Sequence, residues 1–397
     1  MALKKYTRLK YLVSINTEHA VSNEGYVGLE NVESWSGRKI ETNTPEAEGV
    51  ALSYQKGDVL FGKLRPYLAK CYVAEEDACC SMEFLVMRPK KVVSKYLQYR
   101  ILSAEFIDKV NMSTYGAKMP RANWSFIGNL KLDVPSMEEQ QLIANYLDDR
   151  CSKIDAIIAE AKASIEEYKE LKQALISSKV LCGMQPKVSK KTTNEKWLTE
   201  IPKHWRFEKG RHLFYETNVR STTGTEELLT VSQYTGITPR SQKNVTMIEA
   251  ESLEDYKICE VGDIAANTMW MWAGAVGVSS YYGVISPSYN TYRQLHNDFN
   301  DSYLDYLLRT PEIVCEYASR STGIRASRLR LYPAQFLSIY FPVPPQEEQI
   351  EIVEYLEQRL PQMDALISEK QSLIADLEAY KKSLIYEVVT GKRKVVA

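Results

Sequence analysis

The chain has 397 residues, with 50 basic and 51 acidic side chains and a formal net charge of −1. A hydrophobic content of 44% and a charged content of 25% are typical of folded globular domains and exclude extended disorder. No apolar run approaches the ~20 residues of a membrane helix and no signal peptide opens the chain, so we expect a cytoplasmic protein of two or three domains. The balanced charge argues against a globally basic nucleic-acid binder, but it leaves room for local basic patches.

One unit of about 200 residues occurs twice. Val134-Pro-Ser-Met-Glu-Glu-Gln140 returns as Val343-Pro-Pro-Gln-Glu-Glu-Gln349, an offset of 209 residues. Upstream of these motifs the matches between the two copies are weaker, and Gly57-Asp58 matches Gly262-Asp263 at an offset of 205 residues. A drifting offset indicates insertions in loops, where they are tolerated. Each copy therefore has a divergent front and a similar back.

The fronts, residues 1–134 and 203–343, combine strand and helix patterns. Aromatic and β-branched runs predict strands at 59–61, 84–87, 228–231 and 339–343, and helices are expected over 96–110 and 302–319. The fold class we expect is α+β. It consists of two pseudo-repeated halves, each a globular mixed α/β domain followed by a long helix.

The backs, residues 135–182 and 344–391, carry apolar side chains at heptad spacing. The pattern predicts that the two helices pack on each other as an antiparallel coiled coil, with a polar connector at 183–202; two helices that each lie on their own domain are the alternative. Pro361 lies inside the second helix, where we expect a kink or a break near 358–360. The residues predicted to pack in this helix pair are Leu147, Ile154, Ile157, Leu171, Leu175, Leu356, Met363, Leu366, Leu373, Leu377 and Leu384.

Motifs for catalysis and metal binding are missing from the sequence. It contains no phosphate-binding loop, no dinucleotide fingerprint and no histidine pair at ligand spacing. Its seven cysteines form no Cys-x-x-Cys pair, which favours reduced and mostly buried thiols. We therefore expect a non-catalytic chain that binds no metal.

Basic residues gather with aromatic residues in both fronts. Arginine suits phosphate groups and guanine edges, so these clusters favour a nucleic-acid surface over ordinary solvated loops. Residues 1–134 hold 19 basic and 15 acidic side chains, whereas residues 136–182 hold 6 and 9. The acidic helices should therefore face each other or protein partners. The predicted DNA contacts are Lys63, Arg65, Tyr67, Lys118 and Arg121 in the first front, and Trp270, Trp272, Arg325, Arg328 and Arg330 in the second.

The whole chain resembles the specificity subunits of type I restriction-modification systems. The resemblance rests on the two Glu-Glu-Gln helix starts and on Gly57-Asp-Val-Leu-Phe-Gly-Lys-Leu-Arg-Pro-Tyr67. It also rests on Trp197-Leu-Thr-Glu-Ile-Pro-Lys-His-Trp205 and Leu229-Thr-Val-Ser-Gln-Tyr-Thr-Gly236. It implies that each front is a target-recognition domain for half of a bipartite DNA sequence, and that the helices set the spacing between the half-sites.

The same resemblance implies partners and cofactors. Two modification (methyltransferase) subunits and the restriction translocase would dock on this chain, and S-adenosylmethionine, ATP and magnesium would bind to those partners rather than here. Two alternatives remain open. One is an autonomous DNA-binding coiled-coil protein without enzyme partners, and the other is a nuclease or methyltransferase fused to its own DNA reader.

Overall fold

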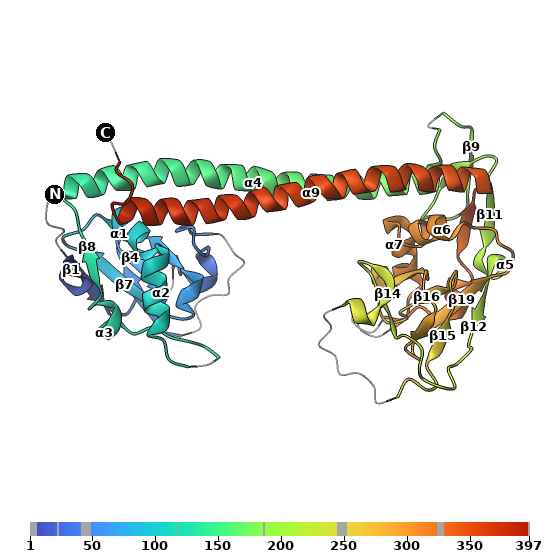
Figure 1. Ribbon diagram of the computed structural model, residues 1–397, viewed down its shortest axis with the longest axis horizontal. Helices are drawn as coiled ribbons and strands as arrows, with labels where there is room; N and C mark the ends of the chain where they lie inside the picture. Colours follow the sequence, from blue (N-terminus) through green and yellow to red (C-terminus); the bar gives the residue numbers. More distant parts are fainter. Residues whose placement is uncertain are drawn as a thin grey trace. The chain divides into compact units, whose positions relative to one another are not determined.

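The computed structural model describes residues 6–21, 24–40, 49–116, 118–185, 187–243, 252–323 and 329–395. The chain forms two compact units, Met1–Ala163 with Lys370–Ala397, and Ser164–Glu369. Each unit has a mixed α/β part and a stretch of two long helices, α4 (Met137–Cys182) and α9 (Gln346–Val389) (Figure 1). The unit boundaries cut across both helices, so the division into fronts, helices and connector stays a prediction.

The first unit is built around a four-stranded antiparallel sheet with the order β2-β7-β4-β5. Two short antiparallel pairs, β1 with β8 and β3 with β6, complete its strands. The bounds are β1 (Tyr6–Arg8), β2 (Val13–Asn16), β3 (Ala51–Tyr54), β4 (Val59–Gly62), β5 (Cys71–Val73), β6 (Ala78–Ser81), β7 (Phe84–Pro89), β8 (Lys131–Asp133), α1 (Ser94–Ile101), α2 (Ala104–Met112) and α3 (Trp124–Ile127).

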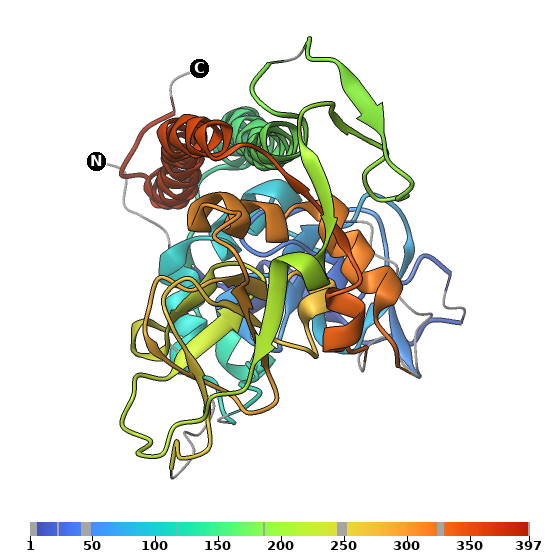
Figure 2. The same cartoon turned by 90° about the vertical axis from the view of Figure 1, so that its right-hand side faces the viewer.

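The second unit repeats this plan with a sheet of the order β12-β19-β16-β17. Figure 2 is turned so that this unit faces the viewer. Its shorter pairs are β10 with β9, β11 with β20, β13 with β14, and β15 with β18. The bounds are β9 (Lys190–Thr192), β10 (Glu200–Pro202), β11 (Arg206–Lys209), β12 (Phe214–Thr217), β13 (Leu229–Ser232), β14 (Gly236–Pro239), β15 (Lys257–Cys259), β16 (Ile264–Ala266), β17 (Val276–Val278), β18 (Gly283–Ile285), β19 (Asn290–Gln294), β20 (Tyr340–Val343), α5 (Gly210–Leu213), α6 (Asp301–Leu308), α7 (Pro311–Arg320) and α8 (Pro333–Phe336).

The predicted α+β class and the internal repeat are confirmed, and the four predicted strands are present as β4, β7, β13 and β20. Each predicted front helix is two helices, however. The Ser103 hydroxyl donates to the Arg100 carbonyl (2.7 Å) and α1 stops before α2 begins. In the second unit Pro311 opens α7 directly after Thr310, because proline favours a first helical turn over a helix interior.

The antiparallel pairing of α4 and α9 is confirmed within each unit. The start of α4 packs with the end of α9 in the first unit, where Lys381 Nζ lies 2.7 Å from Asp155 Oδ1. The end of α4 packs with the start of α9 in the second unit, where Lys172 Nζ lies 2.6 Å from Asp364 Oδ1. Within the described residues, no helix is long and apolar enough to cross a membrane.

Four of the eleven residues predicted to pack in the helix pair have the wrong heptad phase. The stripe through Leu147, Ile154, Leu356 and Leu384 is buried, and Leu175, Met363 and Leu377 on it are half-buried. The other four predicted residues each lie three positions after a residue of this stripe or of its heptad continuation, but the structure buries the residues four positions after it. The wrongly predicted residues Ile157, Leu171, Leu366 and Leu373 are exposed by 47%, 54%, 41% and 43%.

Side-chain chemistry explains this phase. Both a three-residue and a four-residue step satisfy a heptad repeat. The four-residue step buries Cys151, Ile158 and Ile165 on α4, whereas the three-residue step would bury Arg150 and Ser164. The apolar choice is more favourable, because an unpaired buried charge is costly.

Of the kink or break predicted at Pro361, the break is wrong, because α9 continues through this residue to Val389. Proline has no N–H, so one carbonyl of the preceding turn loses its helical hydrogen bond. Because Pro361 is exposed, water can hydrate that carbonyl instead. Leu360 is buried and Met363 is half-buried beside it. Packing on both sides of the proline therefore holds the helix together.

The glutamine of each repeated motif ties a long helix to the α/β part of its unit. Gln140 accepts a hydrogen bond from the Val93 amide (2.8 Å) and donates to the Pro135 carbonyl (3.0 Å). Gln349 accepts from the Asn300 amide (2.8 Å) and donates to the carbonyls of Asp298 and Pro344 (both 2.9 Å). Both glutamines are buried. The motif therefore fixes where each helix starts relative to α1 or α6.

Candidate nucleic-acid interface

The structure brings the five predicted residues of the first front together. Lys63, Arg65 and Tyr67 lie in the connection between β4 and β5, which contains the 3-10 turn Pro66–Leu68. The loop that carries Lys118 and Arg121 is hydrogen-bonded to this connection, because the Arg65 amide donates to the Pro120 carbonyl (2.8 Å) and the Ala122 amide to the Lys63 carbonyl (2.9 Å). We call these five residues the first patch.

The cations of the first patch differ in whether a carboxylate of the described residues forms an ion pair with them. Arg121 donates two hydrogen bonds to Glu83, from Nε to Oε2 (3.2 Å) and from Nη2 to Oε1 (2.7 Å). Among the described residues, no carboxylate forms an ion pair with Lys63, Arg65 or Lys118. Arg121 thus has a structural partner that fixes the loop, and the other three cations are available to an anionic ligand.

The second patch combines Trp270, Trp272 and Arg330. The two indoles stack with centroids 5.7 Å apart and planes 25° apart, around the 3-10 turn Met271–Ala273. Trp270 is 51% exposed, and Trp272 Nε1 donates to the Met269 carbonyl (2.9 Å). Such a pair offers a preformed flat apolar surface.

Arg330 is exposed, and its segment is hydrogen-bonded to the connection that carries the indole pair. Its backbone pairs with Thr322 in both directions (2.9 and 3.0 Å), and the next residue, Leu331, donates from its amide to the Thr268 carbonyl (3.4 Å). The other two predicted contacts of this front, Arg325 and Arg328, lie outside the described residues.

The two patches occupy the same place in the two copies of the fold. Each one lies on the connection between two strands of the four-stranded sheet, β4 to β5 or β16 to β17, and each connection holds a 3-10 turn. In each unit a second loop is hydrogen-bonded to that connection and leads into a short helix, α3 or α8. The same scaffold position therefore presents cations in one unit and indoles in the other.

Two ion pairs that involve buried aspartates hold the turns before β4 and β16, and their role was not predicted. Arg88 binds Asp58 through Nε and Nη2 (both 3.0 Å), and Arg293 binds Asp263 in the same way (2.7 and 3.0 Å). These hydrogen bonds raise the pKa of both guanidinium groups. The sequence signal for this role was the repeated Gly-Asp pair, because its aspartate fixes the turn before β4 or β16.

Further exposed side chains enlarge both patches. Tyr115 and Met119 are exposed in the loop of the first patch, and Tyr332 is exposed two residues after Arg330. They were not predicted as contacts, because the sequence does not show whether an aromatic side chain is exposed or lies in the core. Their exposure beside the predicted cations gives each patch an apolar component.

Five of the seven thiols, those of Cys71, Cys79, Cys80, Cys151 and Cys259, are buried and unpaired, as predicted. Burial raises the pKa of Cys80 and of Cys259 to about 12. In the part of the chain that the structure describes, no cluster of three or more His, Cys, Asp and Glu side chains could hold a metal ion.

Comparison with known proteins shows which proteins this chain resembles. Residues 24–167 match the family model described as type I restriction modification DNA specificity domain. A solved chain from work on complex assembly and conformational transition of a type I restriction-modification system superimposes with a TM-score of 0.73. It has 17% identity and covers 98% of both chains. The HsdS subunit from Thermoanaerobacter tengcongensis superimposes with a TM-score of 0.53 at 17% identity, over 99% of this chain and 98% of that one.

Two curated sequences give the same result. The type I restriction enzyme EcoDI specificity subunit of Escherichia coli is 22% identical over 165 residues, which is 41% of this chain and 35% of that subunit. The putative type I restriction enzyme MjaX specificity subunit of Methanocaldococcus jannaschii is 25% identical over 367 residues, 85% of this chain and 79% of that protein. The resemblance to type I specificity subunits is therefore confirmed.

Proposed function

We propose that this chain is the DNA-recognition subunit of a type I restriction-modification complex, that it reads a bipartite target, and that it performs no catalytic step itself. The observation that carries the proposal is the equivalent placement of the two patches. Two copies of one fold present different chemistry from the same connection. That arrangement is suited to reading two different half-sites on one duplex.

The first patch supplies the electrostatic part of binding in its unit. Lys63, Arg65 and Lys118 form no ion pair with a carboxylate of the described residues, so they contact phosphate groups or guanine edges. Tyr67 is exposed beside them and gives an apolar face with a hydroxyl at its edge. Arg121 holds its loop in place through Glu83 and contributes less to the attraction of DNA.

The second patch supplies mainly shape and apolar contact. The stacked indoles of Trp270 and Trp272 present an aromatic face to base edges or a thymine methyl group. Arg330 adds a cation at the same end of the unit. The two half-sites therefore differ in sequence, because one is read mainly by cations and the other mainly by indoles.

The long helices serve the partner subunits in this proposal. Residues 136–182 and 344–391 are rich in Glu and Asp, which disfavours contact with DNA and favours protein partners. Two modification subunits and the restriction subunits dock on this chain in the cytoplasm. Those partners carry S-adenosylmethionine, ATP and magnesium, and they flip the target adenine for methylation.

Adenine methylation tests the proposal. The chain is co-expressed with the modification subunits of its own system, and methylated adenines are mapped in the host DNA. We expect two short specific sequences separated by a fixed number of unspecified bases. Methylation at a single continuous sequence, or none above the level of the modification subunits alone, overturns the proposal.

A further inference from the structure

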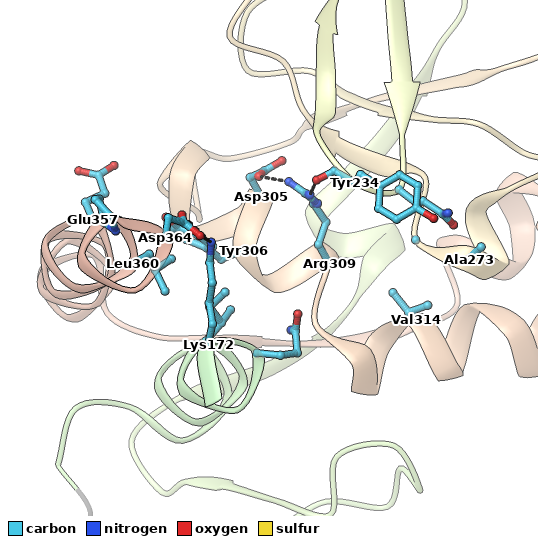
Figure 3. A pocket seen from close by; sticks show the side chains of 15 residues that line it. Lys172, Tyr234, Ala273, Asp305, Tyr306, Arg309, Val314, Glu357, Leu360 and Asp364 are labelled. Carbon is cyan, nitrogen blue, oxygen red and sulfur yellow. Dashed lines mark hydrogen bonds and ion pairs between the residues drawn. The ribbon is translucent and has the colours of Figure 1, made fainter. Parts of the chain in front are cut away.

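The second unit contains a cleft that the first unit partly fills with its own side chains. The cleft lies between α6, the paired helices and the turn after β13, and it encloses about 630 Å³ (Figure 3). The ordinary range for ligand sites is about 300–1,000 Å³. Figure 3 shows Lys172 reaching Asp364 on one side and Arg309 bonded to Asp305 and to the Tyr234 backbone on the other.

The equivalent place in the first unit is a much smaller cavity. It is lined there by Asp155 and Lys381, which correspond to Asp364 and Lys172 at the offset of 209, and it encloses only about 260 Å³. Arg38, which lies in the turn after residue 32, forms an ion pair with Asp155 (Nη2 to Oδ2, 2.5 Å). Trp35 of the same turn lies under Lys382 Nζ, 4.7 Å from the ring centroid. One arginine and one indole thus occupy the site.

Within the described ranges, no residue of the second unit takes the place of Arg38 and Trp35 beside its carboxylates. The side chain of Asp364 is 57% exposed and that of Asp155 only 14%. Asp148 in the first unit accepts a hydrogen bond from Tyr99 (2.7 Å), whereas its counterpart Glu357 makes no hydrogen bond or ion pair with any described residue.

The walls of the cleft fix the chemistry of its occupant. Ile176, Val314 and Leu360 offer apolar surface, and the carboxylates of Glu357 and Asp364 lie at the edge formed by α9. Lys172 and Arg309 are already paired with carboxylates, so the charge left over is negative. An adjoining cavity shares Asp305, Tyr306, Arg309 and Glu357 and adds the carboxylate of Asp301.

We propose that this cleft receives an arginine-bearing segment of one modification subunit, which takes the place that Arg38 and Trp35 fill in the first unit. The inference rests on the proposed function, because the occupant belongs to a subunit of the same complex. The inference goes beyond the proposed function because it makes the docking positions of the two modification subunits unequal. One modification subunit has this anchor and the other docks without it.

The test is the subunit stoichiometry of the assembled complex, measured by native mass spectrometry. Glu357→Arg places the chain's own cation at the cleft and repels the arriving arginine. We expect the complex to change from two modification subunits per chain to one, with at least a tenfold weaker affinity for the second, since truncating or reversing one partner of a charge pair at an interface raises the dissociation rate. Glu357→Gln should act in the same direction but less strongly.

The matched control is Glu369→Arg, an exposed glutamate twelve residues further along α9. It should leave two modification subunits bound, and thermal unfolding of all three variants should coincide with that of the wild type. Two bound subunits in Glu357→Arg overturn the inference. Equal loss in both arginine variants also overturns it, because the helix surface and not the cleft then binds. A wild-type chain that binds no modification subunit contradicts the proposed function instead.

Discussion

Lys381 on α9 binds both carboxylate oxygens of Asp155 on α4, at 2.7 and 2.8 Å, and its side chain is only 8% exposed. The pair between Lys172 and Asp364 repeats it at the offset of 209, but with exposures of 28% and 57%. Both pairs link the two helices at one defined register. Their difference in burial makes them a natural pair of tests for what holds the helices together.

Lys381→Ala should lower the free energy of unfolding by about 1–3 kcal/mol. It removes one partner of a buried pair, and Arg38 remains to compensate Asp155 in part. Lys172→Ala should lower it by no more than about 1 kcal/mol, because a solvent-exposed pair contributes little. Chemical denaturation of the two variants checks this, and equal effects would show that burial does not govern the strength of these pairs.

Gln349→Leu should destabilise the second unit by about 2–4 kcal/mol. The substitution keeps the volume of the side chain, but it leaves the Asn300 amide and two carbonyls buried without their partner. Gln346→Ala is the control, because Gln346 is exposed and donates only to the Asn297 carbonyl. Denaturant titration that ranks the control as the more damaging change would contradict the role assigned to the motif.

The thiols should differ sharply in reactivity. Cys315 is exposed, whereas burial raises the pKa of Cys80 and Cys259 to about 12. At pH 8 an alkylating reagent should modify Cys315 at least about a hundredfold faster than the buried thiols, because the thiolate is the reacting species. Peptide mapping after timed alkylation checks this, and uniform labelling of all seven cysteines in the native protein would refute it.

The same shifts predict alkaline instability. A thiol whose folded pKa is raised holds its proton more tightly in the folded chain than in the unfolded chain. Its contribution to stability is complete below the unfolded pKa of about 8.5 and is lost as the pH rises toward about 12. Thermal unfolding measured from pH 8 to pH 11 should show a falling midpoint, and Cys259→Ser in the same series should reduce the slope.

Arg65→Ala should weaken DNA binding by the assembled complex and reduce its dependence on salt. If Arg65 neutralises one phosphate, the slope of log affinity against log salt should fall by about 0.9. Lys153→Ala, an exposed lysine on α4, is the control and should leave the slope unchanged. An unaltered slope in Arg65→Ala would show that this side chain contacts no phosphate.

The sequence predicted the large features of this fold because they depend on repeated patterns. The offset of 209 identified both helix starts, and the four strand runs were found because they are continuous and apolar. The phase of the helix pair was missed because two register choices satisfy the same heptad repeat. The break at Pro361 was wrong because packing of Leu360 and Met363 outweighs the loss of one backbone hydrogen bond.

The candidate site was predictable in composition but not in arrangement. Lys63 and Arg121 are 58 residues apart, and only the backbone pairing of their loops brings them together. The bond between Arg121 and Glu83 has no local signal, since Glu83 precedes β7. The cleft of the second unit became visible only by comparison with Trp35 and Arg38, whose positions depend on the fold of the first unit.

The most direct measurement of the central claim is adenine methylation mapping in cells that carry the complete system with either Arg65→Ala or Trp270→Ala. Equivalent patches on two copies of one fold predict a bipartite motif. They also predict that Arg65→Ala relaxes one half of it and Trp270→Ala relaxes only the other. A single continuous motif, or two variants that alter the same half, would contradict the account.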